Sequence, residues 1–343
     1  MNGRNLSSTT NTNNIQSFQL ILPEAAASGF LFRKFSYAKL YVENDASKMH
    51  RRFSVKKEWI YPAGLFLAAL IWGFAFVAQR SAGAVLETFF FNAIRFLLGA
   101  ACLFPICSAR RISFRDPLLW KLGAALSLCI FTAGFFQQEA LRFAGSGKVG
   151  FITSFYIILV PIGQLFFGKK PDGRIWLSVL LSLVGLYLLS VQQDGGGFGR
   201  PEMMVFLTAL FFAIHILLTE RYVSELNVLA LSAVQFLLAG FLSLFFAVLR
   251  QSLDFGAAAE ALPASLYAGI LSCGLGYTLQ LFGQKGTKAS VASLIMSFEA
   301  VFAAVGGALL LNERLSPREI AGCVLMLFAV LLAQLPLKFT KKV

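Results

Sequence analysis

GTKASVASLIMSFEAVFAAVGGALLLNERLSP, residues 286–317, is the stretch from which the rest of the chain is best interpreted. Its apolar part, Val291–Leu311, has 21 residues. As a helix rising about 1.5 Å per residue, it would cross a hydrocarbon layer roughly 30 Å thick. One acid, Glu299, lies eight residues beyond Val291. An ionisable side chain at that depth costs on the order of 2.5–3.5 kcal/mol, so it usually has a partner, a cavity or a function.

The composition of the whole chain is typical of a polytopic membrane protein. Of its 343 residues, 57% are hydrophobic and 14% are charged, and the mean hydropathy is +0.71. Soluble domains are nearer to about 45–50% apolar and about 25% charged. The net charge of +13 would suggest nucleic acid in a soluble protein, but the basic residues lie mainly between apolar runs. We therefore expect the lipid bilayer, and no nucleic acid, as a partner.

Ten apolar runs follow the first 58 residues, and each can span a bilayer if some of them tilt or thin it. The runs are Trp59–Ala78, Thr88–Cys107, Leu118–Gln137, Val149–Gly168, Ile175–Val191, Met203–Thr219, Val228–Leu249, Leu262–Phe282, Val291–Leu311 and Ile320–Leu335. Because backbone groups in lipid must be paired within the segment, the sequence predicts an all-α integral membrane protein with ten transmembrane helices. The short loops leave no room for a catalytic or nucleotide-binding domain, so no ATPase subunit is implied.

The distribution of Lys and Arg predicts the orientation. With the N-terminus inside, 16 basic residues flank the inner ends of the runs and 7 flank the outer ends. We therefore expect a multi-pass protein of the bacterial inner (cell) membrane, with a partly disordered N-terminal tail (1–58) and a basic C-terminal tail (338–343) in the cytoplasm. Met49 begins a basic collar before the first run and is an alternative start, which leaves open whether residues 1–48 belong to the mature protein.

The chain contains an internal repeat. A shift of 143 places Ser154-Phe155 on Ser297-Phe298 and Gln137 on Gln280. The halves are then 59–191 and 203–337, joined by the linker 192–202. Because each half has five spans, an odd number, the second copy enters the membrane from the opposite side. Such inverted-topology repeats are typical of alternating-access transporters, which bind substrate between the halves near the midplane.

Three ionisable side chains lie deep in the predicted spans. Arg95 lies about 12 Å below the outer surface. It either snorkels to the headgroups, anchors a substrate carboxylate or phosphate, or pairs with Glu299. His215 and Glu299 both lie near mid-depth and could exchange protons with solvent if they face a wet cavity. A histidine packed in a helix interface is the alternative for His215.

Further polar side chains are candidates for the substrate pathway, although interhelical hydrogen bonds would explain them equally well. These residues are Gln79, Gln137, Gln138, Tyr156, Gln164, Gln235, Tyr277 and Gln280. Several are equivalent under the repeat, because Arg95 corresponds to Gln235 and Tyr156 to Glu299. Pro161 removes a backbone donor and is expected to kink the fourth span. The five cysteines lack metal-ligand spacing, and no nucleotide-binding or hydrolase motif occurs, so we expect no metal, no cofactor and no catalytic residue.

Four stretches carry a resemblance to a known family. They are WGFAFV (72–77), RFLLGA (95–100), ITSFYIILVPIGQLFF (152–167) and SFEAVFAAVGGALLLNERLS (297–316). In this order and on these spans they resemble the EamA branch of the drug/metabolite transporter superfamily. The resemblance implies a secondary transporter with a central cavity between the halves. It also implies that Trp72, Arg95, Tyr156, Pro161 and Glu299 occupy pathway or gating positions.

The sequence thus predicts a secondary active transporter that moves a small metabolite by alternating access. The resemblance implies an amino acid or related compound as the substrate and export as the direction, although the residues themselves name neither. Two alternatives stay open at this point: a lipid or lipid-carrier flippase of the same fold, and a membrane-embedded lipid-modifying enzyme. The sequence does not decide the coupling ion or the oligomeric state.

Overall fold

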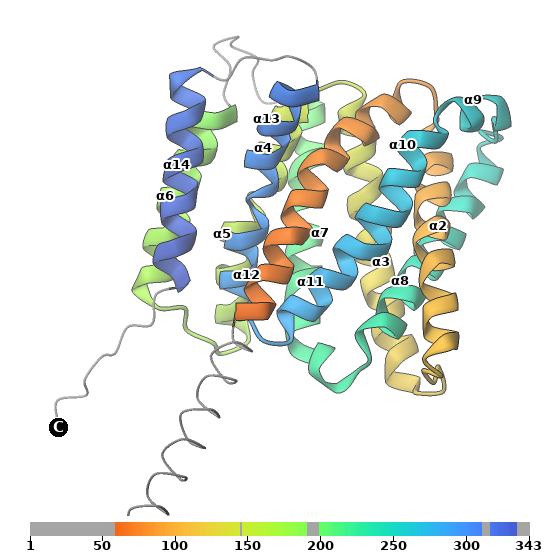
Figure 1. The fold of residues 1–343 in the computed structure, drawn as a ribbon, viewed down its shortest axis with the longest axis horizontal. Coiled ribbons are helices and arrows are strands. Elements are labelled where there is room, and N and C mark those ends of the chain that lie inside the picture. The colour runs from red at the N-terminus through yellow and green to blue at the C-terminus, as the bar shows by residue number, and fades with distance from the viewer. Residues whose placement is uncertain (1–58, 145, 191–198, 311–315, 335–343) are drawn as a thin grey trace, which may run out of the picture. The chain divides into compact units, whose positions relative to one another are not determined.

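All regular secondary structure in residues 59–144, 146–190, 199–310 and 316–334, the part described by the computed structural model, is helical (Figure 1). The helices are Trp59–Gly83, α2 (Thr88–Ala109), α3 (Pro117–Leu141), α4 (Ser146–Thr153), α5 (Tyr156–Phe166), α6 (Gly173–Ser190), α7 (Arg200–Tyr222), η1 (Val223–Glu225), α8 (Val228–Leu249), α9 (Phe255–Glu260), α10 (Leu262–Leu266), η2 (Tyr267–Gly276), α11 (Tyr277–Gln284), α12 (Ala289–Met296), α13 (Glu299–Leu310) and α14 (Pro317–Gln334). The predicted tails 1–58 and 338–343 and most of the linker 192–202 lie outside the described residues.

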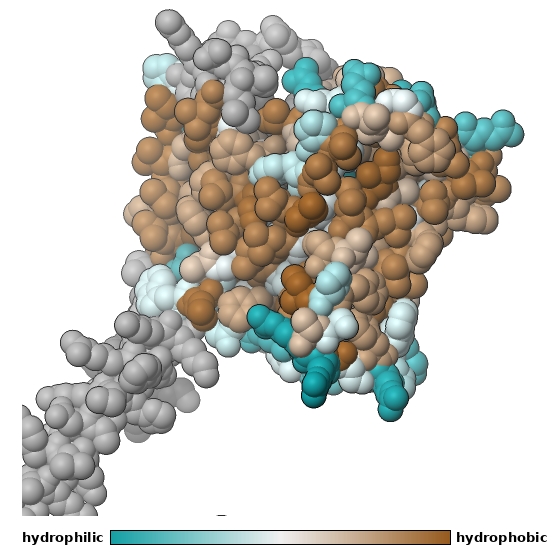
Figure 2. All heavy atoms as spheres, turned by 45° about the vertical axis from the view of Figure 1, so that its right-hand side comes forward, coloured by the Kyte–Doolittle hydropathy of each residue, from teal (hydrophilic) through white to brown (hydrophobic). Residues whose placement is uncertain are grey.

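The helices of this part have the length and apolarity of membrane spans. Nine candidate spans occur among the described residues, and the apolar stretch Gly173–Leu188 of α6 forms a shorter tenth helix. Figure 2 shows a broad hydrophobic band with hydrophilic residues gathered above and below it. Large apolar side chains such as Phe241, Phe245 and Phe328 are exposed on these helices, which would be costly in water but is stable in lipid. The chain is therefore a multi-pass membrane protein.

Helices that are equivalent under the repeat pack against each other. α2 packs extensively against its counterpart α8, and α6 packs against its counterpart α14. The broken spans pack crosswise, since α5 contacts α12, which is the counterpart of α4. Figure 1 shows α14 beside α6 and α12 beside α5. The pairs α2–α8 and α6–α14 are expected when two halves of like sequence meet about a pseudo-two-fold axis, because a helix near the axis then faces its own counterpart.

Two of the predicted spans are interrupted rather than continuous, and the breaks lie at equivalent positions. The fourth span divides into α4 and α5 at Ser154-Phe155, and the ninth divides into α12 and α13 at Ser297-Phe298. The prediction of one unbroken helix over Val291–Leu311 was therefore wrong.

The local hydrogen bonds explain both interruptions. The amide of Phe155 donates to the carbonyl of Ile152, and that of Phe298 donates to Ile295, so each turn tightens to an i→i−3 pattern. The preceding serine hydroxyl in each case donates to a carbonyl of the helix before it, at 2.9 Å for Ser154 and 2.8 Å for Ser297. Pro161 lies inside α5, and the interruption of this span falls before it.

The eighth span combines α10 and α11 with a ten-residue π-helical stretch, η2, between them. Glycines allow η2 to approach α2 closely. A Cβ atom at Gly269 would lie 2.6 Å from Cβ of Leu98, and one at Gly274 would lie 2.5 Å from Sγ of Cys102. Wide π-helical turns often occur where a helix contributes to a functional site. Here the turn directs Ser272 and Tyr277 toward the interior of the bundle.

Candidate functional site

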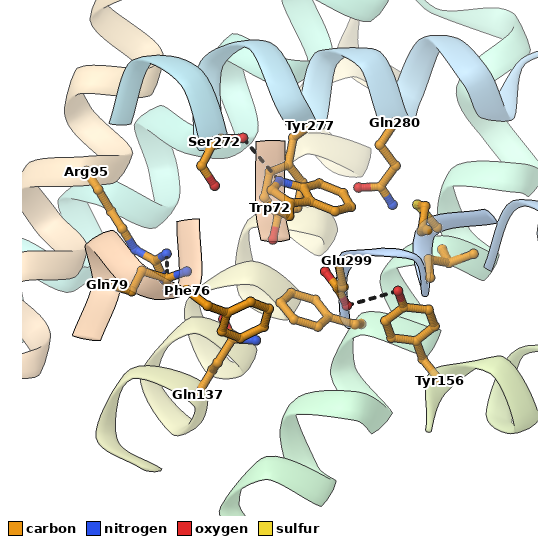
Figure 3. A pocket seen from close by; sticks show the side chains of 13 residues that line it. Trp72, Phe76, Gln79, Arg95, Gln137, Tyr156, Ser272, Tyr277, Gln280 and Glu299 are labelled. Carbon is orange, nitrogen blue, oxygen red and sulfur yellow. Dashed lines mark hydrogen bonds between the residues drawn. The ribbon is translucent and has the colours of Figure 1, made fainter. Parts of the chain in front are cut away.

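A cavity lies where the two broken helices, η2, α11 and the first helix converge (Figure 3). It leaves about 40 Å³ for the centres of water molecules. Each water needs roughly 10–15 Å³ of such space, so the cavity has room for only a few waters and must open to admit a metabolite. The lining residues are Trp72, Phe76, Gln79, Arg95, Gln137, Tyr156, Phe212, Ile216, Ser272, Tyr277, Gln280, Met296 and Glu299.

The two residues that begin the second half-helices meet on one wall of the cavity. The Tyr156 hydroxyl donates a hydrogen bond to Oε1 of Glu299 at 3.0 Å. Tyr156 is the first residue of α5 and Glu299 is the first residue of α13. Their exposed fractions are 3% and 5%. An acidic side chain at a helix N-terminus also lies near backbone amides that have no partner within the helix.

Arg95 lies on the other side of the cavity from this pair (Figure 3). Its Nε donates to Oδ1 of Asn92 at 2.8 Å, and its Nη1 donates to Oε1 of Gln79 at 2.9 Å. The guanidinium carbon lies 4.7 Å from the ring centroid of Phe96, within the range of a cation–π contact. The side chain is 5% exposed and is turned inward, so it does not snorkel to the headgroups.

Arg95 has no acidic partner in the described part of the chain. The ion pairs found there involve Arg142, Lys169 and Arg174, and Arg95 makes no direct bond to Glu299. A buried cation without a counter-ion is costly, because neutral amides and rings compensate only part of its lost hydration. An ion pair with Glu299, one of the three alternatives that the sequence left open for Arg95, is therefore absent from this conformation.

Aromatic rings form the roof of the cavity in Figure 3. The ring centroids of Trp72 and Tyr277 lie 4.8 Å apart. The Trp72 indole donates to the carbonyl of Ser272 at 3.3 Å, which fixes the ring against η2. Gly276 makes this approach feasible, since a Cβ atom there would lie 2.8 Å from Nε1 of Trp72.

His215 is 1% exposed and lies behind the cavity wall rather than on it. Its Nε2 lies 3.1 Å from Oε1 of Gln235, and its Nδ1 lies 3.4 Å from Nε2 of Gln280. Gln280 does line the cavity, so it connects the histidine to that space. His215 and Glu299 are thus near the same cavity but do not touch each other in this conformation.

The remaining predicted pathway residues differ in position. Gln137 lines the cavity and bonds to the Thr153 hydroxyl at 3.3 Å. Gln138 is fully buried outside it and donates to the backbone carbonyl of Gln79 at 2.9 Å, where it ties α3 to the first helix. Gln164 lies near one end of the bundle and donates to Glu220 at 3.1 Å.

Glu220 was not singled out by the sequence, although it follows the sixth apolar run directly. It accepts from Gln164, from Lys169 at 2.8 Å and from the backbone amide of Ala289 at 3.0 Å. Ala289 is the first residue of α12, and its N-cap Lys288 provides no side-chain cap. Glu220 therefore caps α12 from a distant helix and joins the two halves at the end that is predicted to be cytoplasmic.

A second contact lies at the same end, in the loop between α11 and α12. The Lys285 ammonium donates to the carbonyl of Leu226 at 2.7 Å. Partial burial lowers the pKa of Lys285, because the charged form loses hydration there.

Five apolar or weakly polar lining residues were also missed by the sequence: Phe76, Phe212, Ile216, Ser272 and Met296. Nothing in an apolar run distinguishes a residue that faces a cavity from one that faces lipid. In the part of the chain that the structure covers, no group of three or more His, Cys, Asp or Glu residues could hold a metal ion.

The sequence pattern of the EamA-like transporter family matches this chain twice, over residues 59–191 and 200–335. The chain belongs to the EamA-like transporter family. Both matches cover a five-span half, so the two copies of the repeat are two EamA units in one chain.

Several relatives of this EamA chain carry transporter names. An uncharacterized transporter of Archaeoglobus fulgidus is 32% identical over 273 residues, which cover 79% of this chain and 85% of the relative. The threonine/homoserine exporter RhtA of Escherichia coli is 28% identical over 254 residues, covering 64% and 80% respectively. The S-adenosylmethionine/S-adenosylhomocysteine transporter of Chlamydia muridarum is 28% identical over 199 residues, covering 52% and 61%.

Proposed function

We propose that this EamA protein is a secondary transporter that exports a small metabolite of the amino-acid class across the bacterial cell membrane, with both termini in the cytoplasm. The substrate binds in the cavity between the halves. Arg95 holds its anionic group, and Glu299 exchanges the proton that couples transport to the proton gradient.

The observation that carries the proposal is the buried cation in the cavity wall. The Arg95 guanidinium is oriented by Asn92 and Gln79, and no carboxylate among the described residues compensates its charge. A bound carboxylate would supply the missing counter-charge and could bind the planar guanidinium in bidentate fashion. The substrate thus completes an electrostatic arrangement that the protein alone leaves incomplete.

Glu299 is proposed as the coupling residue because it combines burial, a cavity position and a place at a helix break. Tyr156 holds it in one conformation. A half-helix that begins at the cavity can tilt against its partner half when the carboxyl group gains or loses a proton. The side chains Trp72, Gln79, Gln137, Tyr277 and Gln280 complete the proposed pathway.

Two relatives support the substrate class. Threonine, homoserine and S-adenosylmethionine, which appear in their names, share an α-amino carboxylate group. That group matches a site that offers a cation on one wall and a carboxyl group on another.

The test is transport into proteoliposomes that contain the purified protein, with a panel of radiolabelled amino acids and a proton gradient. We expect saturable, gradient-dependent accumulation of at least one amino acid. Arg95→Lys keeps the charge but loses the planar fork, and Arg95→Met loses both, so KM should rise in that order. Arg142→Met is the matched control, because Arg142 lies outside the cavity in a partly exposed ion pair with Glu139, and it should leave KM unchanged. An unchanged KM in Arg95→Met would refute the role of Arg95. Thermal stabilisation of the purified protein by lipids instead of amino acids would refute the proposed substrate class and favour the flippase.

A further inference from the structure

Four side chains form a continuous hydrogen-bonded relay behind the cavity wall. Gln284 donates to the backbone carbonyl of Ile216 at 2.9 Å. Gln280 donates to Oε1 of Gln284 at 3.1 Å and approaches Nδ1 of His215 at 3.4 Å. The other ring nitrogen, Nε2, lies 3.1 Å from Oε1 of Gln235. The four side chains are 0–3% exposed, so solvent does not substitute for any of these partners.

The backbone carbonyl fixes the direction of the whole relay. A carbonyl oxygen only accepts, so the Gln284 group that faces Ile216 must be its NH₂, and its oxygen must face Gln280. Gln280 must then present its own NH₂ to Gln284. The same NH₂ reaches Nδ1 of His215, which therefore accepts and leaves Nε2–H to donate to Gln235.

The direction of these hydrogen bonds leaves the side-chain oxygen of Gln280 without a partner. Both N–H groups of Gln280 are used by the relay, and its oxygen is buried without a partner in the described residues. Figure 3 shows the Gln280 side chain hanging from α11 toward the cavity, with its oxygen turned toward the rings of Trp72 and Tyr277. Several buried polar atoms of the described residues have no partner, Nε2 of Gln235 among them, but the Gln280 oxygen belongs to a side chain that lines the cavity. Because an unpaired buried acceptor is costly, this one points to a ligand that supplies a donor.

We propose that Gln280 is a specificity-determining residue that accepts a hydrogen bond from the substrate ammonium group, and that His215 is the positioning residue that keeps its oxygen turned to the cavity. This inference rests on the proposed function, in which Arg95 binds the substrate carboxylate. In this arrangement Arg95 donates hydrogen bonds to the substrate on one side of the cavity, and Gln280 and Glu299 accept them on the other. The combination selects zwitterions over simple carboxylic acids.

The selectivity arises from the unpaired group as much as from the new bond. A carboxylic acid that lacks the amine leaves the Gln280 oxygen buried and without a hydrogen-bond donor. Sites built around a buried polar group reject analogues that cannot pair with it far better than apolar pockets reject a missing methylene.

The experiment compares amino acids with their deaminated partners on the purified full-length protein. The pairs are L-threonine with 3-hydroxybutanoate, L-homoserine with 4-hydroxybutanoate, and L-leucine with 4-methylpentanoate. Dissociation constants come from ligand-dependent thermal shifts. For wild type we expect at least one amino acid to bind about tenfold or more tightly than its partner.

Three variants distinguish the role of Gln280 from that of His215. Gln280→Met removes the acceptor, and His215→Phe removes the relay; each should bring the affinity ratio close to one without weakening the binding of the deaminated acid. His215→Asn keeps an acceptor oxygen close to the position of Nδ1 and should restore the ratio. Thr278→Val is the matched control, because Thr278 lies on α11 but bonds to Ser232 and does not line the cavity.

The outcomes separate the two proposals. A ratio unchanged in Gln280→Met overturns the role of Gln280, and a ratio unchanged in His215→Phe overturns the role of His215. If His215→Phe does not fold, a normal ratio in Gln280→Met still overturns the inference. Equal wild-type binding of both members of every pair overturns it while leaving Arg95 as the anion site. If no compound binds, or binding survives in Arg95→Met, the proposed function itself fails.

Discussion

Tyr156 and Glu299 occupy the same place in the two halves, 143 residues apart, and are joined to each other by a 3.0 Å hydrogen bond. Each is the first residue after a helix break, so the pseudo-two-fold relationship brings a neutral phenol and an acid together. The repeat is therefore symmetric in backbone and asymmetric in chemistry at its centre. That asymmetry places a single ionisable acid where an inverted-repeat transporter binds its cargo.

Glu299→Gln should uncouple transport from the proton gradient. The amide keeps the size of the side chain and can still accept from Tyr156, but it cannot exchange a proton. We expect gradient-driven accumulation to be lost while exchange of labelled for unlabelled substrate across the proteoliposome membrane continues. Glu319→Gln, at an acid in the first turn of α14, is the control and should behave as wild type. Full accumulation in Glu299→Gln would remove Glu299 from the coupling mechanism.

Tyr156→Phe should destabilise the protein through Glu299. Loss of the hydroxyl leaves the buried carboxyl group without its donor, at a cost of about 1–3 kcal/mol. The thermal unfolding midpoint of the detergent-solubilised protein should fall accordingly. The double variant Tyr156→Phe/Glu299→Gln should lose less than the sum of the single losses, because the two changes remove one interaction. Strictly additive losses would show that the pair is not coupled.

Gly73→Ala should disrupt the contact between the first helix and α13. A Cβ atom at Gly73 would lie 2.3 Å from Cβ of Phe302 and 2.8 Å from the amide nitrogen of Ala303, so the two backbones would have to separate. Overpacking of this kind costs about 1–3 kcal/mol. Gly173→Ala is the matched control, because a Cβ atom there meets nothing within 4 Å. Equal unfolding midpoints for the two variants would contradict this account of the helix contact.

Glu220→Ala should weaken the junction of the halves at the end near Lys169. It removes the distant cap of α12 and leaves the amide of Ala289 without its side-chain acceptor, which we expect to cost about 1–3 kcal/mol. Asp172→Ala removes a 3.7 Å ion pair with Arg174 in which the Asp172 side chain is 66% exposed, and it should cost less than about 1 kcal/mol. Thermal unfolding of both variants checks the order, and an equal or larger loss in Asp172→Ala would reject it.

The fold could be predicted far better than the site. The apolar runs report the length and depth of each span, so the all-helical membrane architecture and the two halves followed from hydropathy and from repeated residues. The breaks at Ser154 and Ser297 could not be predicted, because both serines sit in unbroken apolar runs. These helices are interrupted where the serine hydroxyl donates to a backbone carbonyl of the preceding helix and the turn tightens. Neither feature changes the hydropathy of the segment.

For the candidate residues, the depth in the membrane could be predicted from the sequence, but the helix face on which each lies could not. Depth along the chain singled out Arg95, Glu299 and His215, and the first two line the cavity while His215 lies behind its wall. Depth places a residue along the membrane normal, but the face of the helix on which it lies depends on how that helix packs.

The spans, the repeat and the equivalence of Tyr156 with Glu299 follow from the order of the residues, because hydropathy and self-similarity are properties of that order. Three further relationships appear only once the helices are packed: this pair forms a hydrogen bond, Arg95 lacks an acidic partner among the described residues, and Gln280 lines the cavity with an unpaired oxygen. Those relationships depend on helix rotation, side-chain rotamers and contacts between residues far apart in the chain. A linear pattern does not encode them locally.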